Sequence, residues 1–146
     1  MNKVLSIIIG VTLFSSPLFA NEDPFCFSEG GAKYDIDPML LQVISKVESN
    51  HNNEALNYNS NGTFDFCHMQ INSGNYRSLG HEKWMSIADP CKCTKVGAEI
   101  LKKCIEKHGY VWEAVGCYNA VSKGKRIKYA WKVFNELKRT YAAQNK

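Results

Sequence analysis

The sequence predicts a mainly helical domain with a small β-hairpin insert, cross-linked by disulfides. Apolar residues recur at helical spacing in several long stretches of the chain. Between two of these stretches lies an asparagine-rich segment with Asn61-Gly62, a strong signal for a tight turn between strands. The six cysteines are an even number, which is typical of the disulfide framework of a small exported domain.

The 146-residue chain has the composition of one globular domain, with 45% hydrophobic and 22% charged residues. This balance excludes a collagen-like, low-complexity or disordered chain. The net charge of +4 permits attraction to an acidic polymer but is too small to indicate a nucleic-acid-binding protein. We expect a monomer that does not bind nucleic acid and, since no phosphate loop or nucleotide motif is present, needs no cofactor.

The first twenty residues have the pattern of a secretory signal. Met1-Asn2-Lys3 is a short basic start, an apolar run follows, and Ala20 provides a small residue at the expected cleavage site. An uncleaved anchor is the alternative, but the apolar run is too short to span a bilayer comfortably. We expect residues 1–20 to be a signal peptide and residues 21–146 to form a single domain.

The first predicted helix follows Asp37-Pro38, because Asp37 suits the N-cap and Pro38 suits the first helical position. Its apolar stripe consists of Leu40, Leu41, Ile44 and Val47. Glu48 follows Ile44 by four positions and therefore lies on or beside this stripe. Asn50 to Asn53 end the pattern.

The remaining elements follow in order along the chain. Short extended pieces near residues 56–58 and 63–72 flank Asn61-Gly62 and predict the hairpin. Residues 94–108 predict a helix with Gly109 as its C-cap, and residues 112–120 a shorter one. The last helix is predicted from a stripe that consists of Ile127, Ala130, Trp131, Phe134, Leu137 and Tyr141.

The six cysteines allow fifteen pairings, and spacing alone does not choose among them. They are Cys26, Cys67, Cys91, Cys93, Cys104 and Cys117. A zinc site built from Cys91, Cys93, Cys104 and His108 is the competing interpretation. The separation of Cys91 from Cys93 is shorter than the usual zinc-ligand spacing, and export favours oxidation, so disulfides are the preferred prediction.

Glu48 is the residue with the clearest chemical potential. A carboxyl group on an apolar helix face loses solvation, which raises its pKa and keeps it protonated closer to neutral pH. A protonated carboxylic acid in an apolar cleft is what cleavage of a glycosidic bond requires as its general acid. The alternative is an ordinary helix-end charge that extends into solvent.

Three short motifs favour the first interpretation. They are Val47-Glu48-Ser49-Asn50, then Cys67-His68-Met69-Gln70, then Cys117-Tyr118-Asn119-Ala120. In this order they resemble the Glu-Ser, Gly-Leu-Met-Gln and Ala-Tyr-Asn motifs of bacterial lytic transglycosylases, which have an α+β, lysozyme-like fold. More closely, the chain is similar to the small members associated with type III and type IV secretion systems and type IV pili. The resemblance extends from about Cys26 to about Phe134.

The resemblance implies roles for particular residues. Glu48 matches the single catalytic acid/base of the family, and Ser49 beside it would help to hold the Glu48 carboxyl group or form a local helix hydrogen bond. The expected groove residues that bind the glycan are Met69, Gln70, Tyr118, Asn119 and Tyr129. Met69 has an ordinary core position as its alternative.

Two departures from the family pattern affect the second motif and the third. Cys67-His68 stands where the family has Gly-Leu, and Cys117 stands where it has Ala. His68 could be a second catalytic group, with an exposed polar residue as the preferred interpretation. Asp65 is the nearest candidate for a second acid, although its segment is more simply a turn and a strand.

With a single carboxylic acid, the substrate has to supply the second group. The resemblance implies cleavage of the MurNAc–GlcNAc bond of peptidoglycan with formation of 1,6-anhydro-MurNAc. A lysozyme-type hydrolase and a non-catalytic wall-binding protein are the alternatives.

The resemblance also implies a periplasmic location and, from cysteines frequent in the family, a Cys26–Cys91 disulfide. Cys67–Cys93 and Cys104–Cys117 are then favoured, with Cys67–Cys117 as a rival.

Overall fold

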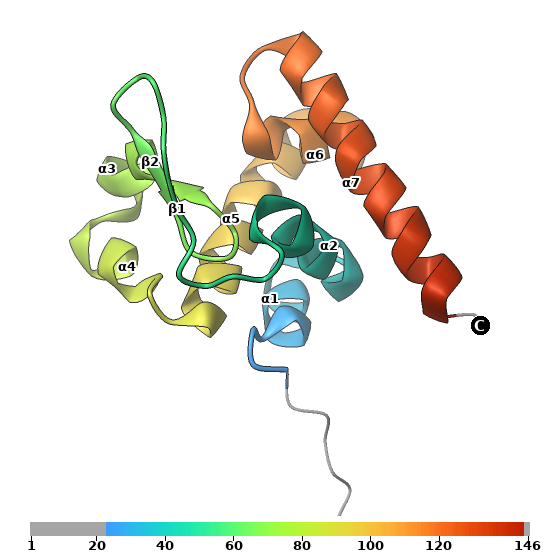
Figure 1. The fold of residues 1–146 in the computed structure, drawn as a ribbon, viewed down its shortest axis with the longest axis horizontal. Coiled ribbons are helices and arrows are strands. Elements are labelled where there is room, and N and C mark those ends of the chain that lie inside the picture. The colour runs from blue at the N-terminus through green and yellow to red at the C-terminus, as the bar shows by residue number, and fades with distance from the viewer. Residues whose placement is uncertain (1–22, 145–146) are drawn as a thin grey trace, which may run out of the picture.

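The computed structural model describes residues 23–144, so the signal peptide expected over residues 1–20 lies outside the described part. The fold is mainly helical, with a small sheet beside the helices (Figure 1). The helices are α1 (Phe27–Tyr34), α2 (Pro38–Ser49), α3 (Tyr76–Leu79), α4 (His81–Ser86), α5 (Pro90–His108), α6 (Trp112–Asn119) and α7 (Lys123–Gln144), with a 3-10 turn η1 (Ser73–Asn75). The strands are β1 (Leu56–Tyr58), β2 (Phe64–Phe66) and β3 (Ile71–Asn72). Among residues 23–144, no helix is both long and apolar enough to span a bilayer.

Helix α2 has the predicted boundaries, and its caps explain them. The Asp37 side chain accepts a hydrogen bond from the Met39 backbone N–H (2.8 Å), and Pro38 occupies the first turn. The helix ends at Asn50, whose φ of 55° places it in the left-handed region. Leu41 and Ile44 are fully buried, so the predicted stripe faces the core and brings Glu48 to its edge.

The insert contains one strand more than the predicted hairpin. The sheet has the order β1-β2-β3, and both pairs are antiparallel. Leu56 pairs with Phe66 and Asp65 pairs with Asn72. The predicted extended piece over residues 63–72 is therefore two strands, because the chain turns sharply between Phe66 and Ile71.

One predicted helix has the wrong start, and three short helices were not predicted. Helix α5 begins at Pro90, four residues before the predicted start at Thr94, because the Asp89 carboxylate caps it by accepting from the Lys92 N–H (2.8 Å). The short helices α1, α3 and α4 were not predicted, since their few turns provide too little apolar periodicity for detection.

The predicted stripe of α7 has the wrong phase. Ala130 is buried and Leu137 partly so, but Ile127, Trp131 and Phe134 are exposed. The side of α7 that packs on the domain instead carries Tyr129, Ala130 and Val133. Tyr129, which is not a member of the predicted stripe, is therefore part of the core.

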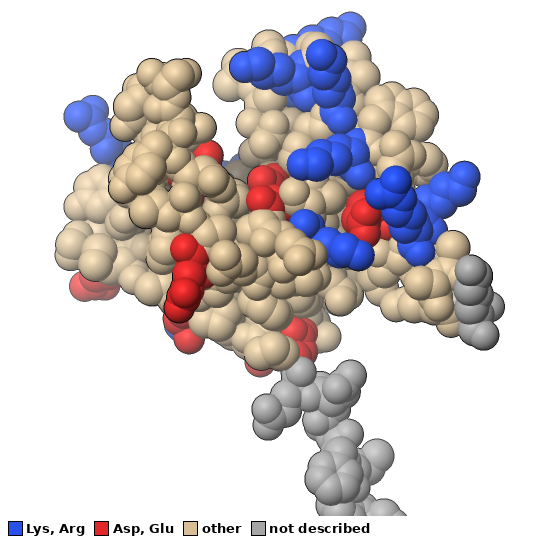
Figure 2. Space-filling view, viewed as in Figure 1, with Lys and Arg blue, Asp and Glu red and all other residues tan. Residues whose placement is uncertain are grey.

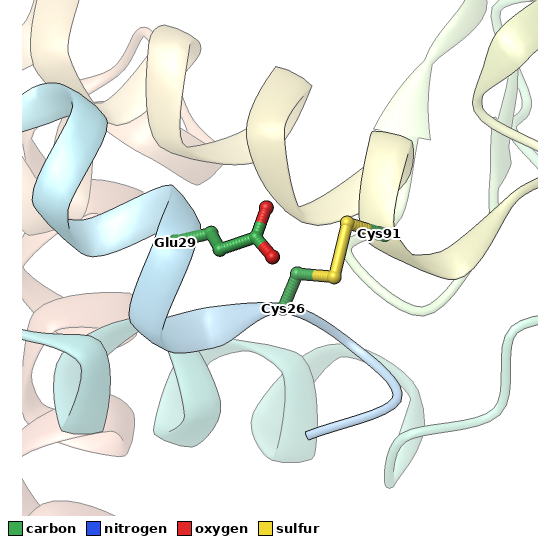
Figure 3. Close-up of side chains that lie close together, drawn as sticks. All are labelled: Cys26, Glu29 and Cys91. Atoms are coloured by element: carbon green, nitrogen blue, oxygen red, sulfur yellow. A yellow bond between two sulfur atoms is a disulfide. The ribbon is translucent and has the colours of Figure 1, made fainter. Parts of the chain in front are cut away.

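Three disulfides cross-link the domain in the pairing favoured above. Cys26–Cys91 ties α1 to the start of α5, Cys67–Cys93 ties the turn before β3 to α5, and Cys104–Cys117 joins α5 to α6. Cys91, Cys93 and Cys104 thus lie in three different disulfides, which overturns the zinc alternative. Figure 3 shows the Glu29 carboxylate beside Cys26–Cys91; it pairs with the Lys95 ammonium (2.7 Å).

Candidate active site

A groove of about 710 Å³ separates the sheet from the C-terminal end of α6 and the start of α7. Figure 2 shows this hollow between the β1–β2 turn and the α6–α7 segment. Its wall consists of Glu48, Asn59, Ser60, Asn61, Thr63, Asp65, Gln70, Ile71, Asn72, Asn75, Ile100, Tyr118, Asn119, Ala120, Val121, Ser122 and Lys125. Its volume is within the usual range of small-molecule binding sites, and most of the lining side chains can form hydrogen bonds.

Glu48 lies in the last turn of α2, at the floor of this groove. Burial raises the pKa of its carboxyl group to about 7, because few water molecules can stabilise the charged form. The negative charge of Asp65 acts in the same direction. Near neutral pH a large fraction of Glu48 is therefore protonated, and the group can both donate and accept a proton.

Two residues of α7 oppose this rise in the pKa of Glu48. The Tyr129 hydroxyl donates a hydrogen bond to Glu48 Oε1 and stabilises the carboxylate. The Lys132 ammonium donates to the Val47 carbonyl (3.2 Å) and places a positive charge close by. Burial and these contacts together keep the carboxyl pKa close to neutral instead of higher.

A tight turn, residues 67–70, carries the second motif. The Gln70 N–H donates to the Cys67 carbonyl (3.0 Å), and both residues have positive φ, 63° at Cys67 and 49° at Gln70. The left-handed region favours glycine, so the family's glycine at the first position is explained by the backbone. Here the Cys67–Cys93 disulfide and a set of hydrogen bonds hold a non-glycine residue in that conformation.

Side chains from two other motifs support this turn. The Ser49 hydroxyl donates to the His68 carbonyl (2.9 Å) and accepts from the Asn52 N–H (3.0 Å). The Tyr118 hydroxyl donates to the Met69 carbonyl (2.7 Å). The partners of Ser49 are thus backbone groups and not the Glu48 carboxyl, and the motifs surrounding Glu48 are joined to one another.

The expected glycan-binding residues fall into two groups. Gln70, Tyr118 and Asn119 line the groove. The Met69 side chain is fully buried and lies against Gly97 of α5, where an added Cβ would approach Met69 Cε to 2.7 Å. Met69 is thus a core residue that fixes the turn, whereas Tyr129 reaches Glu48 directly.

His68 is buried, so the preferred expectation of an exposed polar residue is wrong. Its Nε2 donates to the Pro90 carbonyl (3.0 Å), which leaves Nδ1 as an acceptor for the Ser45 hydroxyl (2.8 Å). Ser45 in turn accepts from His51 Nδ1 (2.8 Å). Burial lowers the pKa of His68 to about 4, so the ring is neutral and acts as a link between α2, the 67–70 turn and α5.

Asp65 on β2 faces the same groove as Glu48. Its two carboxylate oxygens accept hydrogen bonds from the side-chain amides of Asn72 (2.7 Å) and Asn59 (2.9 Å). The sequence interpretation of Asp65 as a strand residue is confirmed, and the fold also makes it a neighbour of the candidate acid.

Sequence reasoning missed two lysines of the site. Lys125 lines the groove, and Lys132 lies beside Glu48. Both belong to α7 and lie four and three positions from Tyr129, so they share a helix face with it. The expected place of Tyr129 in the groove was the available signal, but only the correct phase of α7 identifies its neighbours.

Glu48 lines a polar groove, carries a tyrosine hydroxyl on its carboxyl group and has a pKa near neutral, which defines a candidate site for general acid–base catalysis. Comparison with known families agrees: the transglycosylase SLT domain matches residues 25–142. The chain therefore belongs to the SLT transglycosylase family.

Individual relatives cover most of the chain. Protein IpgF of Shigella flexneri is 37% identical over 128 residues, which cover 83% of this chain and 84% of that protein. Invasion protein IagB of Salmonella typhimurium (strain LT2) is 34% identical over 123 residues, 77% of each chain. A peptidoglycan-binding-like protein of Escherichia coli O157:H7 is 31% identical over 146 residues, which cover 90% of this chain and 86% of that protein.

Proposed function

We propose that this protein is a lytic transglycosylase that cleaves the β-1,4 bond between MurNAc and GlcNAc in peptidoglycan. The observation that carries the proposal is the carboxyl group of Glu48, which lines a polar groove and whose pKa burial raises to about 7. A group with this pKa can serve first as an acid and then as a base at neutral pH. Family membership and the peptidoglycan-binding-like relative support the substrate.

The chemistry needs no second protein carboxylate. Glu48 donates its proton to the glycosidic oxygen as the bond from C1 of MurNAc to that oxygen breaks. The 2-acetamido oxygen of the same sugar attacks C1 and forms an oxazolinium intermediate. Ionised Glu48 then accepts the proton of the C6 hydroxyl, whose oxygen bonds to C1 as the acetamido oxygen leaves. The product is a 1,6-anhydro ring, Glu48 is protonated again, and no water is consumed.

Tyr129 and Lys132 suit these reaction steps, because the Glu48 carboxyl group has to lose a proton and then regain it. Their hydrogen bond and positive charge stabilise the ionised Glu48 that exists between the two steps. The C6 hydroxyl belongs to the reacting sugar, so its effective concentration at C1 exceeds that of a loosely held water.

A lysozyme-type hydrolase is the second candidate, and Asp65 is the observation that favours it. Asp65 lines the same groove as Glu48, and a second carboxylate could activate or orient a water molecule. Both oxygens of Asp65 are, however, occupied by the amides of Asn59 and Asn72. We therefore give Asp65 a role only in the hydrolase alternative, as the group that would orient a water molecule.

Product masses distinguish the two functions. Purified peptidoglycan is digested and the fragments are weighed, since an anhydro end is one water lighter than a reducing end. Predominantly anhydro-MurNAc ends are expected. Predominantly reducing ends would contradict the transglycosylase proposal and favour hydrolysis assisted by Asp65.

The biological role that we propose is local opening of the cell wall for an envelope-spanning secretion system or pilus. The resemblance to small secretion-associated transglycosylases and the similarity to an invasion protein support it. Such a role requires a periplasmic location, which the signal-like residues 1–20 favour.

A further inference from the structure

The exposed side of α7 carries an ordered row of side chains that the groove does not use. The row, here called the α7 stripe, consists of Lys123, Ile127, Trp131, Phe134 and Lys138, and every member is exposed. Their spacings of four, four, three and four place them along one face of the helix. Three large apolar residues thus lie in line with a lysine at each end.

The apolar centre of the stripe forms a hollow together with α6. Trp112 of α6 lies edge-to-face against Phe134 (ring centroids 5.2 Å apart), and Phe134 lies edge-to-face against Trp131 (5.5 Å). With Ile127 and Ala130 these rings surround a cavity of about 250 Å³. Trp131 and Ile127 are 59% and 50% exposed, although burial of their apolar surface would be favourable. The concave shape accommodates an apolar side chain.

The charge around the hollow is strongly positive. Helix α7 contains seven lysine and arginine residues and one acidic residue, Glu136. Figure 2 shows the basic side chains gathered along this helix. Within residues 23–144, Lys123, Lys128 and Lys138 form no ion pair. A ligand of this surface gains most if it carries carboxylates beside its apolar groups.

These features argue for one kind of occupant. A second copy of this chain, paired through the same face, would bring two sets of α7 lysines together, which is repulsive. A flat lipid surface would leave the concave space between Trp112 and Trp131 unfilled. An amphipathic helix fits, because its apolar side chains repeat at the spacing of the stripe and one of them can enter the hollow.

We propose that the α7 stripe binds an acidic amphipathic helix of a partner protein. Its apolar residues cover Ile127, Trp131 and Phe134, and carboxylates near its two ends pair with Lys123 and Lys138. These lysines are fifteen positions apart, about 22 Å along a helix, which sets the length that the partner helix has to span. The surface lies outside the groove, so binding there is independent of glycan cleavage.

A pair of synthetic peptides tests the proposal. The first is a helical peptide of about 18 residues with leucines at helical spacing and two glutamates at each end; the second has lysines in place of the glutamates. Dissociation constants are measured by calorimetry with the folded protein. We expect the glutamate peptide to bind at least about tenfold more tightly than the lysine peptide, and Trp131→Ser to weaken its binding by about tenfold or more.

Charge reversal provides the sharper arm. In Lys123→Glu/Lys138→Glu the preference should invert, so that the lysine peptide binds better. Lys92→Glu/Lys107→Glu on α5 has the same change in net charge and should leave the preference unchanged. Release of wall fragments should be unaffected in the stripe variants, which shows that they are folded.

Several results would overturn the proposal. They are equal affinity for the two peptides, no saturable binding up to about 1 mM, or a preference that survives the charge reversal. A Trp131-dependent dimer in sedimentation would assign the stripe to a second copy. Trp131-dependent binding to phosphatidylglycerol vesicles, with no peptide binding, would assign it to a lipid surface.

Discussion

The Tyr129 hydroxyl on α7 donates a hydrogen bond to the Glu48 carboxyl group on α2, although 81 positions separate the two residues. The bond stabilises the ionised form of Glu48, while burial stabilises the protonated form. The last helix thus takes part in setting the pKa of a group near the start of the domain. Tyr129 is buried, and burial beside Glu48 raises its own pKa well above the ordinary value, so it stays a donor.

We predict that Tyr129→Phe shifts the pH dependence of wall cleavage upward. The variant keeps the ring in the core but loses the bond that lowers the pKa of Glu48, so the acid form persists to higher pH. The maximal rate should fall by about tenfold, because the ionised intermediate form loses a donor. A rate–pH profile from pH 5 to 9 measures both effects. An unchanged profile would show that the hydroxyl does not contact the working carboxyl group.

We predict that Glu48→Gln stabilises the fold, and only at higher pH. The pKa of Glu48 is about 7 in the folded protein and near 4.5 in the unfolded chain, so the native state binds more protons between these values. Wild-type stability therefore falls as the pH rises from 4.5 to 7, whereas glutamine stays neutral. The variant should gain up to about 3 kcal/mol above pH 7 and almost nothing at pH 4.

Urea unfolding of both proteins at pH 4 and pH 8 measures this difference. Ser49→Ala serves as a neighbouring control, since it alters no titrating group. A gain for Glu48→Gln that is the same at both pH values would argue against a raised carboxyl pKa.

We predict that His68 makes the fold sensitive to acid. Its pKa is about 4 in the folded protein and near 6.5 unfolded, so the stability that it contributes is present above pH 6.5 and is lost as the pH falls toward 4. The loss should amount to roughly 3 kcal/mol. The nearby His51, whose pKa burial also lowers, acts in the same direction.

Unfolding free energies between pH 7 and 4 test this in a Glu48→Gln background, where the opposing titration of Glu48 is absent. His68→Gln should be less stable at pH 7, because the link between Ser45 and Pro90 is weakened, but should show a shallower loss toward pH 4. An equally steep loss in that variant would place the acid sensitivity elsewhere.

We predict that glycine suits position 70 better than alanine does. Gln70 has a φ of 49°, in the region where only glycine is free of steric cost. Gln70→Gly and Gln70→Ala both remove the side-chain bonds to the Cys67 and Ala55 carbonyls. The glycine variant should nevertheless be more stable by about 1 kcal/mol. Thermal unfolding of the pair decides, and a more stable alanine variant would contradict the left-handed turn.

The longer helices could be predicted from the sequence, because their caps and apolar stripes are clear. Helix α2, with Asp37 as its N-cap and Pro38 in its first turn, is an example. The sequence prediction misjudged α7, because Trp131 and Phe134 are large apolar residues at helical spacing although they face outward, whereas the buried Tyr129 and Val133 stand outside that stripe. Periodicity alone does not show which apolar stripe a helix buries. The same error concealed Lys125 and Lys132 as residues of the site.

The candidate site was predicted through its motifs, and the physical roles of the motif residues came from the structure. Ser49 and Tyr118 hold the 67–70 turn through backbone carbonyls. Such bonds depend on how distant segments meet, and a sequence pattern contains no information on that geometry. His68 could not be placed for the same reason, since its buried network joins three elements.

The most direct test of the central claim is the release of fragments from purified peptidoglycan by wild type, Glu48→Gln and Asp65→Asn. Circular dichroism verifies that each protein is folded. If Glu48 is the single acid and base, Glu48→Gln should lose activity by about 10²- to 10⁴-fold, while Asp65→Asn remains within about tenfold of wild type. Substantial cleavage by folded Glu48→Gln, or its loss in Asp65→Asn alone, would contradict the claim.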